Sequence, residues 1–428
     1  MAGAEEPPAR MAQRVVATLG RSDEATVFGA GRSAAANAAL ANGIASHILE
    51  LDDVHKESTL HAGAPVIPAA LATAEREHRS GEAFLLAVAL GYEAALRIGE
   101  AVNPSHYRFW HPTGTAATFG AAVAAGSLLG LEAAAMLDAL GSAGTQAAGL
   151  WEFNADGAMS KHLHPGKAAF NGILAADLAR QGFTGASRIL EGARGFFRAT
   201  STDFDPTRVT DGLGTRWKVS ENCYKLHSCC GHTHSAIDMA LEYRATAAWQ
   251  GDAELTSVDV ATYASGYEIV QERNPCTPYQ AKFSLAYCVA VALVEGRVGL
   301  AQFTSDRFSE NGVTDPRIRT LLERVRVTVH PELTARYPAE WGTQILFTRR
   351  DGAAVEMAAA FPRGNPENPV STETLENKLR DLVSVRLGAT VADRAIRVVG
   401  ALELCTDMAT AFADLAPGGA GQWEATRP

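Results

Sequence analysis

The sequence has few cysteines and nothing that resembles an export signal. Its 428 residues include six Cys, and five of these lie at irregular spacings between Cys223 and Cys288. The first residues, MAGAEEPPARMAQRVV, contain Glu and Pro where a signal peptide needs a basic start and an apolar run. Cysteines without such a signal are typical of reduced thiols. We therefore expect a cytoplasmic protein.

Long apolar runs and an excess of basic residues are also missing. The longest weakly polar run, residues 116–131, is short and rich in Gly and Ala, which is typical of a tightly packed core helix rather than a membrane span. The formal net charge of −10 argues against nucleic acid as a partner. The sequence contains no Gly-rich phosphate loop, no GxSxG elbow and no internal repeat, so it gives no support for a nucleotide-binding protein or a serine hydrolase.

Lysine is scarce, because only seven of the 38 basic residues are Lys. Where either cation would serve, the chain uses Arg, so a Lys that is kept could be one whose compact, pKa-tunable ammonium is needed. Codon drift explains the same count. Two of the seven, Lys161 and Lys225, lie beside clustered histidines.

The length predicts two domains, and the pattern changes near Gly212. Small apolar residues at helical spacing predict helices over residues 33–51, 66–79, 82–102, 116–129, 131–149 and 167–181. Their many Ala and Gly residues indicate a bundle with close helix contacts. Later, alternating residues predict strands at 255–264 and 324–330 and a hairpin over 343–357 that turns at Asp351-Gly352, with helices at 234–248 and 284–294.

We therefore predict a mainly α protein. Residues 1–220 form the first segment of a helical domain, residues 221–368 form a smaller α+β domain, and residues 369–428 return to the helical domain. The return includes a helix at 374–383, and the end from Ala409 to Pro428 is expected to be disordered.

Residues 45–72 place a charged cluster between two apolar helices. The cluster contains Glu50, Asp52, Asp53, His55, Lys56, Glu57 and His61. Buried ionised groups cost several kcal/mol unless they are paired, and catalytic sites are where such costs are usually tolerated. The alternative is a solvated loop. We interpret His61 and the Asp52/Asp53 pair as functional, and His55, Lys56 and Glu57 as the solvated side of the loop.

Four short stretches contain nine of the 12 His, which scattered surface histidines would not produce. They are residues 55–61, 106–115, 161–167 and 225–234. Backbone N–H groups at a helix start favour anions. Thr113, Gly114 and Thr115 before one predicted helix, and Gly166 before another, could therefore each receive a carboxylate.

The last stretch leaves two other kinds of site open. Cys229, Cys230, His232 and His234 are possible zinc ligands, although their spacing does not match the usual paired pattern. Cys230 could also be a nucleophile with His232 as its base.

Taken together, these stretches resemble the MmgE/PrpD family, which includes 2-methylcitrate dehydratase, cis-aconitate decarboxylase and iminodisuccinate epimerase. The matching segments include ANGIASHILELDDVH, HAGAPVIPAALATAE, HPTGTAATFGAAVAAGSLLGL, DGAMSKHLHPGKAAFNGILAADLARQGFTG and KFSLAYCVAVALVEG, in the family's order. The resemblance implies an all-helical bundle domain with an inserted smaller α+β lid domain. It also implies a homodimer and a metal-free, cofactor-free active site between the domains.

The resemblance further implies the site residues and the chemistry. Family active-site positions fall on the acidic cluster, His61, His111, Lys161, Lys225, Cys230 and Tyr287. The family removes a proton or CO2 beside a carboxylate, which needs an acid or base that works near neutral pH and cations for the developing charge. We assign Lys161 and Lys225 to substrate carboxylates, His111 as general base or acid with His61 as its partner, Asp52 or Asp53 to orient a His, and Tyr287 as proton donor. The expected substrate contacts are Thr113, Gly114, Thr115, His164, Cys230 and His232.

Departures from the family pattern leave the branch open. The chain has His227 in place of an aromatic residue, Ser228 in place of Pro, and Cys230 where the decarboxylase branch has His. The leading hypothesis is a cofactor-independent lyase, either a dehydratase or a decarboxylase, that acts on a small di- or tricarboxylic acid. The alternatives are an epimerase or isomerase of a small dicarboxylate on the same fold, and a catalytically silent dimeric binding protein.

Overall fold

The computed structural model describes residues 1–412 and residue 415, and it is mainly α. The chain divides into two compact units. Unit 1 consists of Met1–Ile48, Asp52–Asn222 and the described residues of Thr372–Pro428. Unit 2 consists of Leu49–Leu51 and Cys223–Ser371. Three residues of the charged loop therefore group with the later part of the chain, which nothing in their local sequence indicates.

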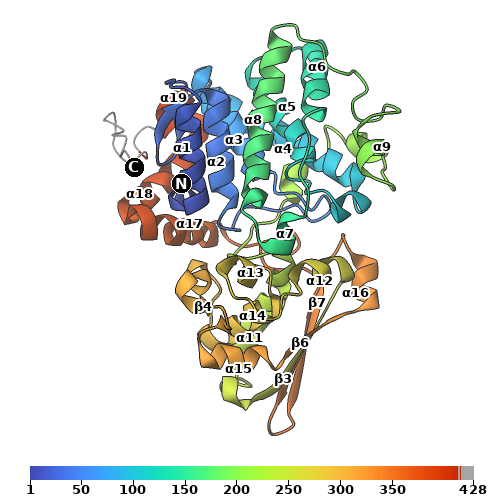
Figure 1. Ribbon diagram of the computed structural model, residues 1–428, viewed down its shortest axis with the longest axis vertical. Helices are drawn as coiled ribbons and strands as arrows, with labels where there is room; N and C mark the ends of the chain where they lie inside the picture. Colours follow the sequence, from blue (N-terminus) through green and yellow to red (C-terminus); the bar gives the residue numbers. More distant parts are fainter. Residues whose placement is uncertain (413–414, 416–428) are drawn as a thin grey trace. The chain divides into compact units, whose positions relative to one another are not determined.

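Unit 1 is helical, and its helices follow the predicted Ala- and Gly-rich segments (Figure 1). Its two short strands are β1 (Ala25–Val27) and β2 (Gly31–Ser33), which pair antiparallel. The helices of this unit are α1 (Pro7–Thr18), α2 (Ala35–His47), α3 (Gly63–Arg76), α4 (Gly81–Val102), α5 (Ala116–Leu128), α6 (Ala133–Gly144), α7 (Phe153–Asp156), α8 (Ser160–Arg180), α9 (Phe196–Thr200), α10 (Thr207–Thr210), α17 (Thr372–Leu387), α18 (Ala389–Gly400) and α19 (Met408–Ala411).

Helices α2 and α8 approach each other closely at two glycines. A Cβ on Gly43 would lie 2.7 Å from the Cα of Gly166, and a Cβ on Gly166 would lie 2.4 Å from the carbonyl oxygen of Leu40. Only glycine allows backbones to approach this closely. The crossing brings the C-terminal end of α2 next to the N-terminal turns of α8, where the candidate site residues lie.

The predicted start of α8 is wrong. The helix begins at Ser160 and not near Lys167, so the stretch KHLHPGK is helical and Gly166 lies inside the helix. Pro165 in the second turn removes only one backbone hydrogen bond, and Gly166 is explained by the contact with α2. Gly166 is therefore not the anion-receiving helix start that we predicted.

The predicted disordered tail is wrong at its beginning. α19 covers Met408–Ala411, and Met408 is buried. The rest of the predicted tail, apart from residues 412 and 415, lies outside the described residues.

Unit 2 contains a four-stranded sheet with the order β6-β3-β7-β8. Its strands are β3 (Leu255–Thr262), β6 (Val325–Val329), β7 (Thr343–Arg349) and β8 (Ala354–Ala359). β3 pairs parallel with β6 and antiparallel with β7. The predicted hairpin is confirmed, because β7 and β8 pair antiparallel around a turn in which Gly352 has φ +81°.

Helices cover one face of this sheet. α11 (His234–Ala245) and α14 (Leu285–Glu295) pack on the strands (Figure 1), and the ring of Tyr243 stacks on Phe347 with the centroids 4.1 Å apart. The remaining α-helices and strands of the unit are α12 (Ala264–Val270), α13 (Pro278–Lys282), α15 (Pro316–Leu322), α16 (Pro331–Arg336), β4 (Phe308–Ser309) and β5 (Gly312–Val313). The role of this unit as a lid stays a prediction.

Of the helices in the described part of the chain, none has both the length and the apolar character that crossing a membrane requires.

Candidate functional site

Unit 1 contains a cluster of five imidazole rings from four separate segments. His47 ends α2, His61 precedes α3, His111 precedes α5, and His162 and His164 lie in the first two turns of α8. The ring centroid of His47 lies 4.9 Å from that of His61, 5.7 Å from that of His111 and 6.2 Å from that of His162. The structure thus brings the predicted residues His61, His111 and His164 together.

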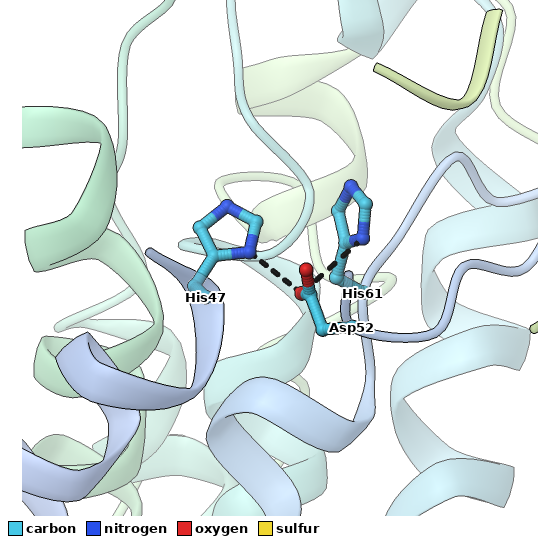
Figure 2. Close-up of side chains that lie close together, drawn as sticks. All are labelled: His47, Asp52 and His61. Carbon is cyan, nitrogen blue, oxygen red and sulfur yellow. Dashed lines mark hydrogen bonds and ion pairs between the residues drawn. The ribbon is translucent and has the colours of Figure 1, made fainter. Parts of the chain in front are cut away.

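Asp52 links two of these rings. Its Oδ2 atom lies 2.6 Å from Nδ1 of His47 and 3.4 Å from Nδ1 of His61. Figure 2 shows the two rings on either side of this carboxylate, with both interactions reaching it. A second contact fixes the ring of His61, because its Nδ1 lies 2.8 Å from the backbone oxygen of Asp53. Asp52 is therefore placed to orient histidines, as a carboxylate does in many catalytic sites.

Asp53 has a different environment. Its carboxylate accepts hydrogen bonds from the hydroxyl of Tyr92 (2.8 Å), from Nδ2 of Asn222 (2.5 Å) and from the first backbone N–H of α3, at Gly63 (3.2 Å). Burial and the neighbouring Asp52 raise the pKa of Asp53, and the three donors oppose that shift. The side chain of Asp53 thus holds the start of α3, and Asp52 is the carboxylate in contact with the imidazoles.

His111 and His164 form a buried pair whose Nδ1 atoms are 3.0 Å apart. Burial first, and then the charges of His164, His47 and Lys161, lower the pKa of His111 well below its usual value. Burial and His47 lead the causes that lower the pKa of His164 to about 3. Both rings are therefore neutral near pH 7, so one donates its Nδ1–H to the Nδ1 of the other. The donor keeps a lone pair at Nε2, and the acceptor keeps an N–H at its own Nε2.

Two lysines of α8 lie near this pair. Lys161 is buried, and its charge is among the causes that lower the pKa of His111 and of His164. Lys167 donates to the backbone oxygen of Gln146 (3.1 Å), and burial lowers its pKa to about 8. The imidazole cluster therefore lies next to a buried cation, which is the group needed to hold a substrate carboxylate.

The backbone at the start of α5 is already hydrogen-bonded. The N–H of Gly114 donates to the oxygen of His111 (2.9 Å) and that of Thr115 to the oxygen of Pro112 (3.1 Å). The hydroxyl of Thr113 lies 3.2 Å from the backbone nitrogen of His61 and accepts its N–H. These residues shape the loops that carry His61 and His111. Because the N–H groups of Gly114 and Thr115 already have backbone acceptors, a substrate carboxylate would have to share or replace those bonds, and its capture there stays a prediction.

The predicted solvated side of the charged loop is wrong for His55 and Lys56, whereas the side chain of Glu57 is 33% exposed and lies 3.6 Å from Arg208. His55 is 1% exposed and Lys56 is 8% exposed. His55 Nε2 lies 3.6 Å from Glu100 and 3.8 Å from Glu221, and Lys218 pairs with both carboxylates at 2.7 and 2.9 Å. Because these partners come from distant segments, the sequence of the loop itself could not indicate them.

In unit 2, Lys225 is buried and paired with Glu50. Its Nζ lies 3.2 Å from Oε2 and 3.3 Å from the backbone oxygen of Glu50, which has the uncommon φ of +56°. The hydroxyl of Ser228 donates to the backbone oxygen of Leu49 (2.7 Å), and Nζ of Lys282 also reaches that oxygen (3.4 Å). The segment Leu49–Leu51 is thus held by side chains from two later segments of unit 2.

The other predicted residues of unit 2 are also buried. His232 hydrogen-bonds the hydroxyl of Tyr263 (2.5 Å) and stacks on Trp341 at 4.5 Å. The backbone N–H of Cys230 donates to the oxygen of Lys282 (3.0 Å). Tyr287 donates its hydroxyl to the backbone oxygen of Gln302 (2.5 Å) inside the apolar core, where burial raises its pKa. This environment fits a core residue better than the predicted proton donor.

Three residues with site contacts, His47, His162 and Glu50, were assigned no role from the sequence. His47 is the only ionisable side chain in the segment 35–47, so a lone titratable group at the end of an apolar helix was the available signal. Glu50 was noted only as part of the charged loop, and its pairing with Lys225 joins residues that are 175 positions apart.

A buried, carboxylate-oriented imidazole cluster beside a lysine, on a mainly helical unit, is the kind of arrangement that acid–base catalysis needs. The family model of the MmgE/PrpD N-terminal domain matches residues 1–209, and that of the MmgE/PrpD C-terminal domain matches residues 227–404. The chain belongs to the MmgE/PrpD family.

Curated relatives of the chain have one activity in their names. The cis-aconitate decarboxylase of Aspergillus terreus is 30% identical over 398 residues, which cover 87% of this chain and 79% of that protein. A cis-aconitate decarboxylase-like protein of Aspergillus oryzae is 29% identical, with 88% and 81% covered. The human cis-aconitate decarboxylase is 28% identical, with 86% and 76% covered. The family and these relatives support an enzyme with a lyase-type role.

Proposed function

We propose that the chain is a cofactor-independent lyase that removes CO2 from a small unsaturated tricarboxylic acid, with cis-aconitate as the first substrate to test. The observation that carries this proposal is the neutral His111–His164 pair beside buried Lys161. The names of the curated relatives support decarboxylation over loss of water.

The residues of unit 1 supply what decarboxylation needs. The ammonium of Lys161 holds a substrate carboxylate and stabilises the charge that develops when the C–C bond to CO2 breaks. The bonding electron pair stays on the substrate as an enolate-like anion. The ring of the His111–His164 pair that carries Nε2–H gives its proton to the anionic carbon. The same Nε2 then takes a proton from solvent, so that both rings return to their starting tautomers.

In this proposal the His47–Asp52–His61 group supports the His111–His164 pair. Asp52 fixes both rings by contacts at 2.6 and 3.4 Å, and His61 is the partner of His111, with ring centroids 6.3 Å apart. For unit 2 we propose that Lys225 binds a carboxylate and that Cys230 and His232 contact substrate. In that case the ion pair of Lys225 with Glu50 must open or be shared with the ligand.

One experiment tests the proposal against its alternatives. The protein is incubated in D2O with cis-aconitate and a panel of citrate-like and succinate-like acids, and the reaction is followed by NMR. Loss of CO2 with deuterium incorporated at the protonated carbon is the expected result. Loss of water marks a dehydratase, and exchange or inversion without net loss marks an epimerase. No change with any acid favours a silent binding protein, and each of these three results contradicts decarboxylation.

We also propose a homodimer in the cytoplasm. Apolar side chains on and next to the C-terminal helices are exposed in the single chain, with Val385 at 77%, Val399 at 50% and Leu404 at 77%, and such side chains are candidates for a subunit interface. None of the six cysteines forms a disulfide, as a reducing compartment allows. Sedimentation equilibrium tests the proposed homodimer, because a monomer at micromolar concentration contradicts a dimer.

A further inference from the structure

His47, Asp52 and His61 form a compact group of possible metal ligands. One ligand atom from each of the three residues lies within 4.8 Å of the other two. We propose that this group binds one divalent first-row transition-metal ion, and that the bound ion blocks the reaction. The binding part rests on donor geometry alone, whereas the inhibition part rests on the proposed function.

The donor set suits such an ion. Two imidazole nitrogens and one carboxylate oxygen bind divalent iron, zinc, cobalt and manganese in proteins. At metal–ligand distances of about 2.1 Å, neighbouring ligands lie about 3 Å apart. The contacts of 2.6 Å and 3.4 Å from Asp52 Oδ2 to the nitrogens of His47 and His61 lie on either side of that value. Figure 2 shows the two rings flanking one carboxylate, so that small ring rotations would aim three donors at a common point.

The surroundings determine how strongly the ion binds. Asp53 follows Asp52 in the chain, and a second acidic side chain there favours a cation. Buried Lys161 is the opposing charge on α8. The contact between His61 Nδ1 and the Asp53 backbone oxygen at 2.8 Å must also loosen if that nitrogen becomes the ligand. We therefore expect affinity well below that of a structural zinc site.

A second group of similar composition gives a contrast. His55, Glu100 and Glu221 also have ligand atoms within 4.8 Å of one another. There the ammonium of Lys218 lies 2.7 Å from Glu100 and 2.9 Å from Glu221, so a protein cation already neutralises the carboxylates. We propose no metal at this second group.

Occupancy by a metal removes groups that the reaction uses. A metal–nitrogen bond occupies the lone pair of each imidazole. A metal–oxygen bond neutralises the negative charge of Asp52. His61 could then no longer act as the partner of His111. Metal binding and turnover are therefore expected to exclude each other.

The binding test uses the EDTA-treated full-length protein and Co²⁺, whose visible absorption reports its coordination. Isothermal titration and absorption should show one site per chain, with affinity at least tenfold lower in His47→Ala and Asp52→Asn. His78→Gln is the matched control, because His78 is an exposed histidine that pairs with Asp407 at 2.9 Å. Circular dichroism checks that each variant is folded. Absence of binding, or equal affinity in wild type and both site variants, overturns the proposal.

The inhibition test is separate. EDTA-treated enzyme should turn over cis-aconitate, Zn²⁺ or Co²⁺ should inhibit it, and added EDTA should restore the rate. Stimulation of the treated enzyme by metal would overturn inhibition together with the cofactor-independent mechanism, while the binding result would stand. Should the treated enzyme not act on any acid of the panel, the proposed function fails and the inhibition part with it, and the titration still decides whether the site binds metal.

Discussion

At the scale of single residues, the proposed mechanism depends most strongly on His111. It is 1% exposed and its Nδ1 contacts His164 at 3.0 Å. We expect His111→Ala to lower kcat by about 10²–10⁴-fold, the usual contribution of a positioned acid or base. The measurement is CO2 release from cis-aconitate, with circular dichroism to show that the fold is kept. A variant with wild-type kcat would remove His111 from the mechanism.

Lys161 is expected to act on binding and on rate together. Replacing it by Ala leaves a substrate carboxylate without its cation, so both a higher KM and a kcat at least tenfold lower should follow. The control is Lys378→Ala, a lysine of α17 outside the proposed site. If the Lys161 variant changes neither parameter, the assignment of that residue to a carboxylate is wrong.

A buried histidine away from the proposed mechanism should make stability depend on pH. Burial lowers the pKa of His106 to about 4, while its ring contacts the hydroxyl of Thr115 at 2.8 Å. An unfolded histidine takes up a proton near pH 6.5, so the unfolded state binds more protons between pH 6.5 and 4. The contribution of His106 is fully present above pH 6.5 and is lost as the pH falls towards 4, by up to about 1.4 kcal/mol per pH unit.

Urea unfolding at pH 7 and pH 5 measures this dependence. The difference between the two free energies of unfolding should be smaller in His106→Gln than in wild type, because Gln does not titrate. An unchanged difference contradicts the prediction, whatever the absolute stability of the variant.

The histidine clusters show what single residues can reveal from sequence. His61, His111 and His164 were singled out because they lie in three of the four histidine-rich stretches, and the fold brings them together. The pairing of His47 with Asp52 could not be predicted, because it depends on how the chain turns after α2. The burial of His55 could not be predicted either. Its own loop is typical of the protein surface, and its buried partners come from distant segments.

At the scale of elements, the crossing of α2 and α8 controls the position of the imidazoles. Gly43→Ala would place a methyl group 2.7 Å from the Cα of Gly166, and such overpacking typically costs about 1–3 kcal/mol. We expect a lower free energy of unfolding in urea and reduced turnover, because His47 and His162 lie one turn from the contact.

Gly400→Ala is the matched control for this substitution. Gly400 ends α18, and a Cβ there would meet nothing within 4 Å. The control should unfold at the same urea concentration as wild type or slightly higher. Equal stability of the Gly43 variant and wild type would mean that the two helices can separate at no cost.

Ser228 supports a loop in unit 2. Its hydroxyl donates to the Leu49 backbone oxygen at 2.7 Å, and Ser228 is fully buried. Ser228→Ala should lower the free energy of unfolding by about 1–2 kcal/mol, because the serine hydrogen bond to that carbonyl is lost. Urea unfolding measures the loss. Ser235→Ala, which removes a buried hydroxyl that donates to Trp341 at 2.9 Å, shows the cost of such a bond elsewhere in the same unit. Unchanged stability in the Ser228 variant would contradict a supporting role.

The elements themselves were largely predictable. Ala and Gly at helical spacing predicted α2 to α6, and Asp351-Gly352 predicted the β7–β8 hairpin, because both signals are local. The start of α8 was missed because Pro165 and Gly166 are typical of a loop, whereas here a contact with α2 requires the glycine. Local patterns cannot report a contact that is made by another helix.

At the scale of the whole molecule, the family and a lyase-type role follow from the order of the sequence motifs and from the two matched family models. The choice among decarboxylation, dehydration and epimerisation depends on where a substrate lies against the imidazoles and lysines. No single stretch of sequence encodes that arrangement.

The grouping of Leu49–Leu51 with Cys223–Ser371 has a consequence for engineering. An inserted domain that is formed by one continuous segment of the chain can be exchanged between relatives as a module. Here the contacts made by Lys225, Ser228 and Lys282 hold a segment that sits between His47 and Asp52 in the chain. A chimera that swaps residues 223–371 alone would therefore separate this segment from its native partners, and a working exchange must carry residues 49–51 along.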